Sequence, residues 1–223
     1  AVGMTLVIAT RGIDLSVGSL IALSAVVATM LIRDRAGAEA ATPLGMIVCC
    51  LAGIAVCGLI GLFTGLMVTV FKIPPFVVTL AMMLVARGVA LICAEGQSIY
   101  QVPESFIWLG RGRDLAGVPN AVVLMLVFYA VAHVVMSRMS LGRYIYAVGG
   151  NAQAARLSGV RVDRILVLVY TIGGALAGLG GIILASQLRS GSPIYGNMYE
   201  MYTIAAVVVG GTSLAGGEGK ILG

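Results

Sequence analysis

Residues 43–71 read PLGMIVCCLAGIAVCGLIGLFTGLMVTVF and contain no Asp, Glu, Lys or Arg. A helix needs roughly 20 apolar residues to cross the hydrocarbon core of a bilayer. This stretch is longer, so a helix here would tilt or begin in the interface. Gly53, Cys57, Gly61 and Gly65 recur at every fourth position and share one helix face. The stretch therefore predicts a membrane-spanning helix with a face that a second helix can approach closely.

The rest of the chain has the same character. Hydrophobic residues make up 60% of it and charged residues 10%, whereas soluble domains carry about 25% charged residues. Only Arg87 is charged within residues 74–94, and further uncharged runs cover residues 15–32, 115–137, 165–188 and 201–217. We expect five or six helical passes in one transmembrane domain over residues 1–223. Residues 1–9 read like the end of an earlier span, so further spans are expected at both ends.

A charged, glycine-rich segment over residues 11–19 separates two apolar stretches, which predicts a discontinuous helix. Asp14 or Ser16 can accept hydrogen bonds from the free amides at the start of the second stretch, as N-cap residues do. An acid at membrane depth is also a functional candidate, because burying it alone is costly. The alternative for Asp14 is a structural cap that forms an ion pair with Arg11.

Residues 138–164 form a basic segment with five arginines and one acid, Asp163. The positive-inside rule places this segment in the cytoplasm, and with it the turn at Lys72. Within it, Asn151 is a favourable N-cap, residues 152–158 favour helix and Gly159 is a favourable stop. Arg156 would lie on this helix, and Leu157 and Ala154 are able to pack. This short cytoplasmic helix is either a solvated connector or a docking helix for a cytoplasmic partner.

Several kinds of chemistry find no support in the residues. The cysteines have no metal-ligand spacing and lie inside apolar runs, so we interpret them as reduced, packing thiols. A phosphate loop needs Lys followed by Ser or Thr after its glycines. In this chain, Lys220 is followed by Ile221. We expect a protein that is not an enzyme, holds no cofactor or metal and binds no nucleic acid.

Four stretches together resemble the ribose-type monosaccharide permeases of ABC importers. They are residues 12–19 (GIDLSVGS), 72–80 (KIPPFVVTL), 149–159 (GGNAQAARLSG) and 204–217 (IAAVVVGGTSLAGG). The third resembles the EAA…G loop of ABC permeases, with Gln153 in the place of the glutamate. The chain departs from the pattern at Arg11, where glycine is usual, and at Tyr202, where an acid is usual.

The resemblance implies a multi-pass permease subunit of the bacterial inner membrane that imports a monosaccharide or similar polyol by alternating access. Cytoplasmic ATP-binding subunits would bind the coupling helices, a second permease subunit would complete the pathway, and a periplasmic sugar-binding protein would deliver substrate. The alternatives are a gradient-driven secondary transporter or channel, and a structural membrane subunit without transport.

Two sets of residues are candidates for these roles. The ATPase-coupling candidates are Asn151, Gln153, Ala154, Ala155, Arg156 and Gly159. The substrate-pathway candidates are polar side chains near the predicted helix breaks: Asp14, Ser16, Ser19, Thr79, Asn197, Glu200 and Thr203.

Overall fold

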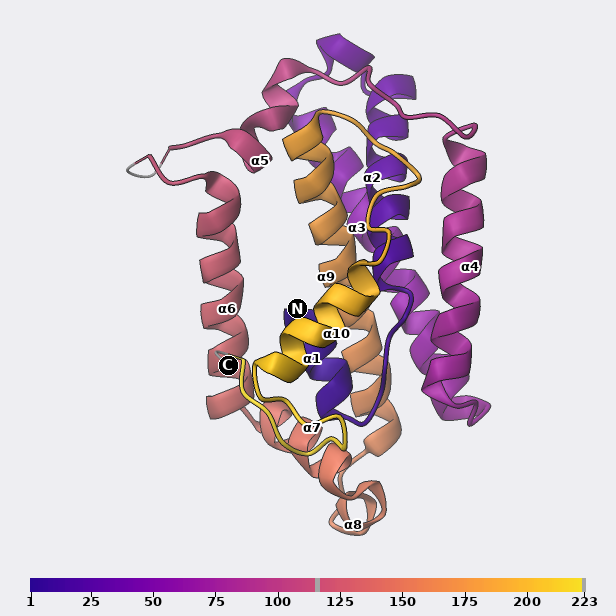
Figure 1. Cartoon of the computed structure of the whole chain (residues 1–223), viewed down its shortest axis with the longest axis vertical. Coiled ribbons are helices and arrows are strands. Elements are labelled where there is room, and N and C mark those ends of the chain that lie inside the picture. Colours follow the sequence, from indigo (N-terminus) through magenta and orange to yellow (C-terminus); the bar gives the residue numbers. More distant parts are fainter. Residues whose placement is uncertain (115–116, 222–223) are drawn as a thin grey trace.

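The computed structural model describes residues 1–114 and 117–221, and every regular element in that part of the chain is a helix. Five of the described helices are long and apolar enough to cross a membrane. They are α2 (Val17–Asp34), α3 (Pro43–Val70), α4 (Pro75–Cys93), α6 (Asn120–Arg138) and α9 (Val162–Leu188). They run between an upper and a lower end of the molecule (Figure 1). The predicted all-α, polytopic membrane fold is confirmed.

Two further helices, α1 (Val2–Ala9) and α10 (Tyr199–Val209), are too short to span and lie at mid-height in the bundle (Figure 1). At 1.5 Å per residue, α10 is about 16 Å long, whereas a bilayer core is about 30 Å thick. Of the five or six passes expected, five are found among the described residues, and the uncharged run at residues 201–217 does not form a sixth. The helix stops at Gly210, and the chain turns at Gly211, which has φ +86°.

The α3–α9 contact places glycines from each helix against the backbone of the other. A Cβ added to Gly61 of α3 would overlap the carbonyl oxygen of Tyr170, and one on Gly65 would lie 2.7 Å from the Cα of Val167. On α9, a Cβ at Gly174 would overlap the carbonyl oxygen of Cys57. Close backbone approach is the usual basis of helix association in lipid. The predicted small-residue face of α3 is thus a real packing surface.

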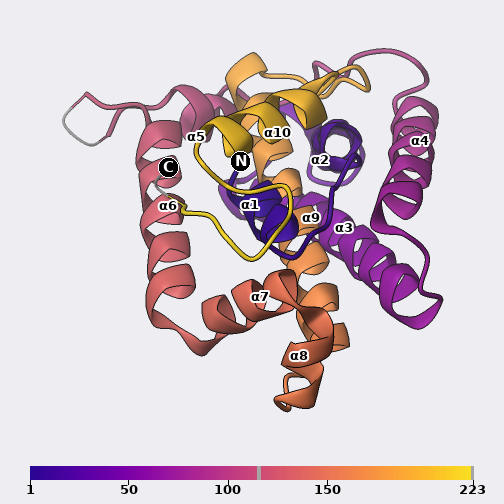
Figure 2. The ribbon, with the colours of Figure 1, turned by 60° about the horizontal axis from the view of Figure 1, so that its bottom comes forward.

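The connecting segments separate as the charge pattern predicted. The turn at Lys72 lies at the lower end with α7 (Ser140–Gly150) and α8 (Ala152–Leu157), whereas η1 (Ala38–Ala40), η2 (Glu104–Ile107) and α5 (Trp108–Arg111) lie at the upper end (Figures 1 and 2). Helix α7 was not anticipated from the sequence. Its buried residues Ile145 and Val148 lie at helical spacing, a signal that the charges around it obscured.

We predict that Gly61→Ala lowers the free energy of unfolding by about 1–3 kcal/mol, because the new methyl group forces two backbones apart. Gly58→Ala is the matched control on the same helix, since the nearest atom to its Cβ would be 3.7 Å away. That variant should be neutral or slightly stabilising, because alanine favours helix. Thermal unfolding of the purified protein in detergent measures both, and equal unfolding temperatures for the two variants would contradict the packing account.

Candidate functional site

Helix α8 has the boundaries that its end residues predict. The side-chain Oδ1 of Asn151 accepts hydrogen bonds from the backbone amides of Gln153 and Ala154, each at 3.0 Å. At the other end, Gly159 adopts φ +86°, a left-handed conformation that suits glycine. Asn151 therefore satisfies two of the amides that a helix start leaves free.

The packing of α8 differs from what we expected. Ala155 is the buried residue, and it packs with Val148 of α7 and Val162 of α9. Ala154 is exposed, and Leu157 is 91% exposed, so neither of these two side chains is buried within this chain. The face of α8 that carries Ala155 packs against α7 and α9. Leu157 lies on a different face of the helix, so its side chain points outward. The last residue of α8 is therefore a leucine that is almost fully exposed.

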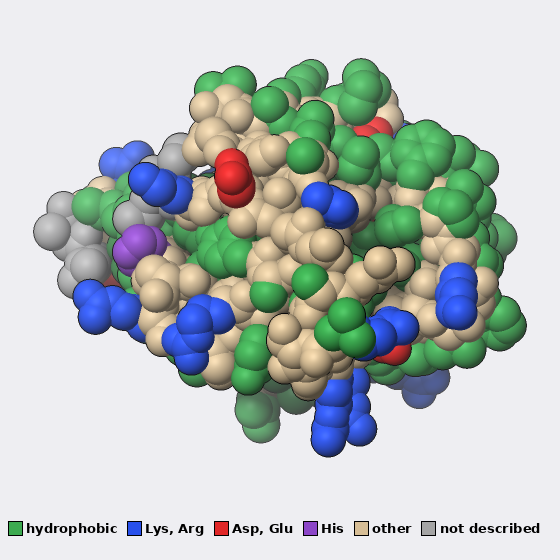
Figure 3. All heavy atoms as spheres, turned by 90° about the horizontal axis from the view of Figure 1, so that it is seen from below, with side chains coloured by type: hydrophobic (Ala, Val, Ile, Leu, Met, Phe, Trp, Pro, Cys, Tyr) green, Lys and Arg blue, Asp and Glu red, His purple; other side chains and the backbone are tan. Residues whose placement is uncertain are grey.

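Arg156 lies beside this leucine and donates to Asp163 at 2.8 Å, with both side chains 61% exposed. Such a surface ion pair contributes only about 0–1 kcal/mol to stability, so the arginine is readily available to another acceptor. Exposed basic side chains are scattered over the lower face (Figure 3). They are Arg11, Lys72, Arg138, Arg143, Arg156, Arg161 and Arg164. The lower face therefore offers an apolar tip in a basic setting.

The break between α1 and α2 is held by Asp14, which is 3% exposed. Its Oδ1 accepts from the amide of Ser16 at 2.9 Å and from the Ser16 hydroxyl at 2.6 Å. Asp14 thus stabilises the turn before α2, but within the described residues neither it nor Ser16 accepts a hydrogen bond from the first amides of α2, so the predicted side-chain N-cap is wrong. The expected ion pair with Arg11 is wrong, because the Arg11 guanidinium instead donates to the backbone carbonyls of Ala215 and Gly150 at the lower end.

Ser19, Asn197 and Glu200 lie at, or next in sequence to, the contact between the start of α2 and the first turn of α10, where Gly18 meets Gly196 and Glu200. Glu200, in the first turn of α10, places its Oε2 against Gly18, where an added Cβ would overlap it. Within residues 1–114 and 117–221, neither this buried oxygen nor the fully buried Ser19 hydroxyl has a hydrogen-bond partner. The carboxylate lies beside the N-terminal turn of α2, whose dipole favours negative charge.

Arg87 joins this group, although the sequence analysis did not name it as a site residue. Its Nη1 donates to Oδ1 of Asn197 at 2.9 Å, while its buried Nε has no partner in the described part of the chain. The available signal was that Arg87 is the single charge in residues 74–94. Ionisable side chains inside a span are functional candidates by default. We call Ser19, Arg87, Asn197 and Glu200 the polar cluster.

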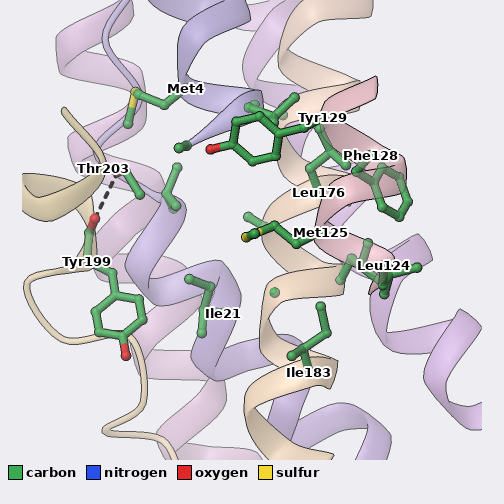
Figure 4. A pocket seen from close by; sticks show the side chains of 18 residues that line it. Met4, Ile21, Leu124, Met125, Phe128, Tyr129, Leu176, Ile183, Tyr199 and Thr203 are labelled. Atoms are coloured by element: carbon green, nitrogen blue, oxygen red, sulfur yellow. Dashed lines mark hydrogen bonds between the residues drawn. The ribbon is translucent and has the colours of Figure 1, made fainter. Parts of the chain in front are cut away.

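The hydroxyl groups of Thr79 and Thr203 donate to backbone carbonyls, and one acceptor of Thr203 is the carbonyl of Glu200 at 3.0 Å. Thr79 of α4 is fully buried and donates to the carbonyl of Ile13 at 3.1 Å, which ties α4 to the helix break. Thr203 donates to the carbonyl of Tyr199 at 2.8 Å and lines a cavity of about 330 Å³ between α6 and the rest of the bundle (Figure 4). Its other walls are mainly apolar, including Phe128 and Ile183. This cavity offers few partners to a polar solute.

Comparison with known proteins gives a consistent set of similarities. The family model described as "Branched-chain amino acid transport system / permease component" matches residues 1–223. The ribose import permease protein of Escherichia coli strain K12 is 44% identical over all of this chain and 68% of its own length. That of Bacillus subtilis strain 168 is 42% identical, covering all of this chain and 67% of the relative. The D-allose transport system permease protein of E. coli K12 is 34% identical over 96% of this chain and 63% of the relative. No solved structure matches the chain.

We predict that Asn151→Ala loosens the start of α8 by about 1 kcal/mol, the usual value of a lost cap. Amide hydrogen exchange at Gln153 and Ala154 should then accelerate by about five-fold if it follows local opening. Gln153→Ala is the control, because it changes an exposed side chain of the same helix and leaves the cap in place. Unchanged exchange in Asn151→Ala would mean that the cap does not hold the helix.

Proposed function

The chain belongs to the branched-chain amino acid transport system / permease component family, and we propose that it carries a monosaccharide or similar polyol into the cell. It is the membrane-embedded permease subunit of an ABC importer of the cytoplasmic membrane, and partner subunits bind and hydrolyse ATP. Two observations support a sugar-like substrate: the ribose and allose permeases among its relatives, and a polar cluster with unpartnered donors and acceptors.

Helix α8 is the observation that carries this proposal. A transport subunit driven by ATP elsewhere needs a rigid feature on its cytoplasmic side through which it can be moved. The capped helix α8 has such rigidity, and the exposed Leu157 and Arg156 give it one apolar and one charged contact. Interface residues that dominate binding are commonly large side chains that become fully desolvated in a partner's pocket. We assign the ATP-binding subunit as that partner.

The further arrangement of the importer follows from the same proposal. A second permease subunit, identical or related, completes the pathway, and a periplasmic sugar-binding protein supplies the substrate at the upper end. ATP binding and hydrolysis displace α8, and the displacement exposes the polar cluster alternately to the two sides. Each state is favoured by its own partner contacts, as any ligand-driven shift between conformations requires.

The polar cluster suits a neutral, hydroxyl-rich molecule. A hydroxyl group both donates and accepts hydrogen bonds. The Nε of Arg87 supplies an unused donor, Oε2 of Glu200 an unused acceptor, and Ser19 a hydroxyl that does either. Leaving such groups buried without partners costs free energy, which a bound sugar hydroxyl would recover when the pathway opens. The opposite charges of Arg87 and Glu200 give the site little net charge.

A gradient-driven transporter is the competing function. Half-helices and a partly buried acid such as Glu200 are typical of that class, in which discontinuous helices meet near the membrane midplane. A gradient-driven transporter does not need a docking helix with an exposed leucine, because no ATP-binding subunit drives it. Co-purification of an ATP-binding subunit with the full-length protein distinguishes the two, because a gradient-driven carrier needs no such subunit.

We predict that Leu157→Asp weakens binding of the ATP-binding subunit by at least about ten-fold, since a loss of 1.4 kcal/mol is ten-fold in affinity. ATP-dependent sugar uptake into vesicles should fall with it. Met139→Asp is the control, because it adds the same charge to an exposed apolar position outside α8 on the same side. If Leu157→Asp leaves subunit binding and uptake at wild-type levels, α8 is not the docking element.

We also predict that Arg87→Gln and Glu200→Gln raise the KM for sugar uptake by about ten-fold or more, because hydrogen bonds to charged groups contribute about 1.5–3 kcal/mol. Binding of the ATP-binding subunit should not change. Arg113→Gln removes an exposed arginine at the upper end and serves as the control. Wild-type KM values in both cluster variants would exclude the cluster from the substrate pathway.

A further inference from the structure

Three segments that are distant in sequence meet at the lower end of the molecule. They are residues 9–11 after α1, residues 149–150 at the end of α7, and residues 215–217 after α10. Arg11 joins all three: its Nε donates to the carbonyl of Ala215 at 2.5 Å and its Nη2 donates to the carbonyl of Gly150 at 2.9 Å. The amide of Gly217 donates to the carbonyl of Ala9 at 3.0 Å. We call this contact the glycine junction.

Glycines let the three backbones touch directly. A Cβ on Gly149 would overlap the carbonyl oxygen of Ala9 and would lie 2.5 Å from the amide nitrogen of Gly217. One on Gly217 would lie 2.8 Å from the Cα of Gly150. With no side chains between them to deform, a shift of one segment is passed to the others. Close-packed contacts transmit displacement in this way because they have little free volume.

Tyr146 adds a fourth tie between α7 and the segment after α10. Its hydroxyl donates to the carbonyl of Gly219 at 2.8 Å. Partial burial raises the pKa of Tyr146, so the phenol remains a neutral donor throughout the physiological range.

The backbone of Arg11 adopts a conformation that is unfavourable for a residue with a side chain. It adopts φ +64°, a region that costs a residue with a side chain about 1–2 kcal/mol and that glycine enters freely. A side chain in this conformation persists only where its surroundings hold it there. Here the holding contacts are the carbonyls of Gly150 and Ala215, which lie on different segments. Because the backbone conformation at this position favours glycine, the presence of arginine indicates that its guanidinium has a structural or functional role.

We propose that Arg11 is the positioning residue that couples the coupling helix to the two broken helices beside the pathway. Gly150 directly precedes Asn151, the N-cap of α8, so the hydrogen bond from Arg11 to the Gly150 carbonyl lies next to the start of that helix. Through Arg11, a displacement of α8 pulls on the α1–α2 break and on the segment that ends α10. Both α2 and α10 contribute members of the polar cluster. This inference rests on the proposed function and names a transmission element within it.

The experiment uses the full-length transporter with all its partner subunits in proteoliposomes and measures sugar taken up per ATP hydrolysed. Arg11→Gly keeps the φ that glycine tolerates and removes the guanidinium. We expect it to lower the ratio by at least about five-fold, the lower end of typical coupling between sites. Binding of the ATP-binding subunit and basal ATP hydrolysis should stay at wild-type levels. Lysine has one ammonium group in place of the forked guanidinium, so it can donate to only one of the two carbonyls at a time. Arg11→Lys should therefore give an intermediate ratio.

Arg143→Ala removes an exposed arginine of α7 on the same face and should leave the ratio unchanged. A wild-type ratio in Arg11→Gly, or an equal fall of uptake and hydrolysis, would overturn the proposal, since a merely structural residue changes the amount of working transporter and not its stoichiometry. If Arg11→Gly does not assemble, a wild-type ratio in Arg11→Lys overturns it instead. Failure of the proposed function gives a different result: no ATP-dependent uptake by the wild-type complex.

Discussion

The structure depends on one constraint: a helix that ends within a bundle must find partners for its free backbone groups within the protein. Two short helices, α1 and α10, end in this way, and a third, α2, begins beside the first turn of α10. Asp14 supplies an acceptor at the α1–α2 break, and Gly217 supplies a donor to the carbonyl of Ala9. These partners come from the chain itself, so the broken ends are drawn into contact with one another and with α7. The site geometry follows from this requirement.

The constraint also explains why polar side chains gather where they do. The α2 start and the first turn of α10 lie side by side, and Gly18 leaves room there for the Glu200 carboxylate. Arg87 extends from α4 toward this contact and donates a hydrogen bond to Asn197. Unused donors and acceptors remain in this cluster, in contrast to the apolar cavity between α6 and the bundle. This contrast supports the proposal that a polar solute binds between the half-helices.

Local chemistry could be predicted from the sequence, and long-range pairing could not. Asn151 and Gly159 set the limits of α8 because caps act over a few residues. The span boundaries followed from missing charges. The uncharged run at residues 201–217 misled, because composition does not distinguish a half-helix from a full span. The Arg11–Asp14 pair failed for a related reason: the real partners of Arg11 lie 139 and 204 residues away. Arg87 meets Asn197 across 110 residues, a pairing that only the fold reveals.

The central claim is that α8 receives mechanical work from a separate ATP-hydrolysing subunit. A photoactivatable cross-linker attached to a cysteine at exposed Gln153 of the full-length protein tests it directly in sealed vesicles that take up sugar. The account predicts a covalent product with the ATP-binding subunit, formed with different yield in the presence and absence of ATP, and uptake blocked once the product has formed. A cross-linker that reacts only with lipid or water while ATP-driven uptake continues would contradict it.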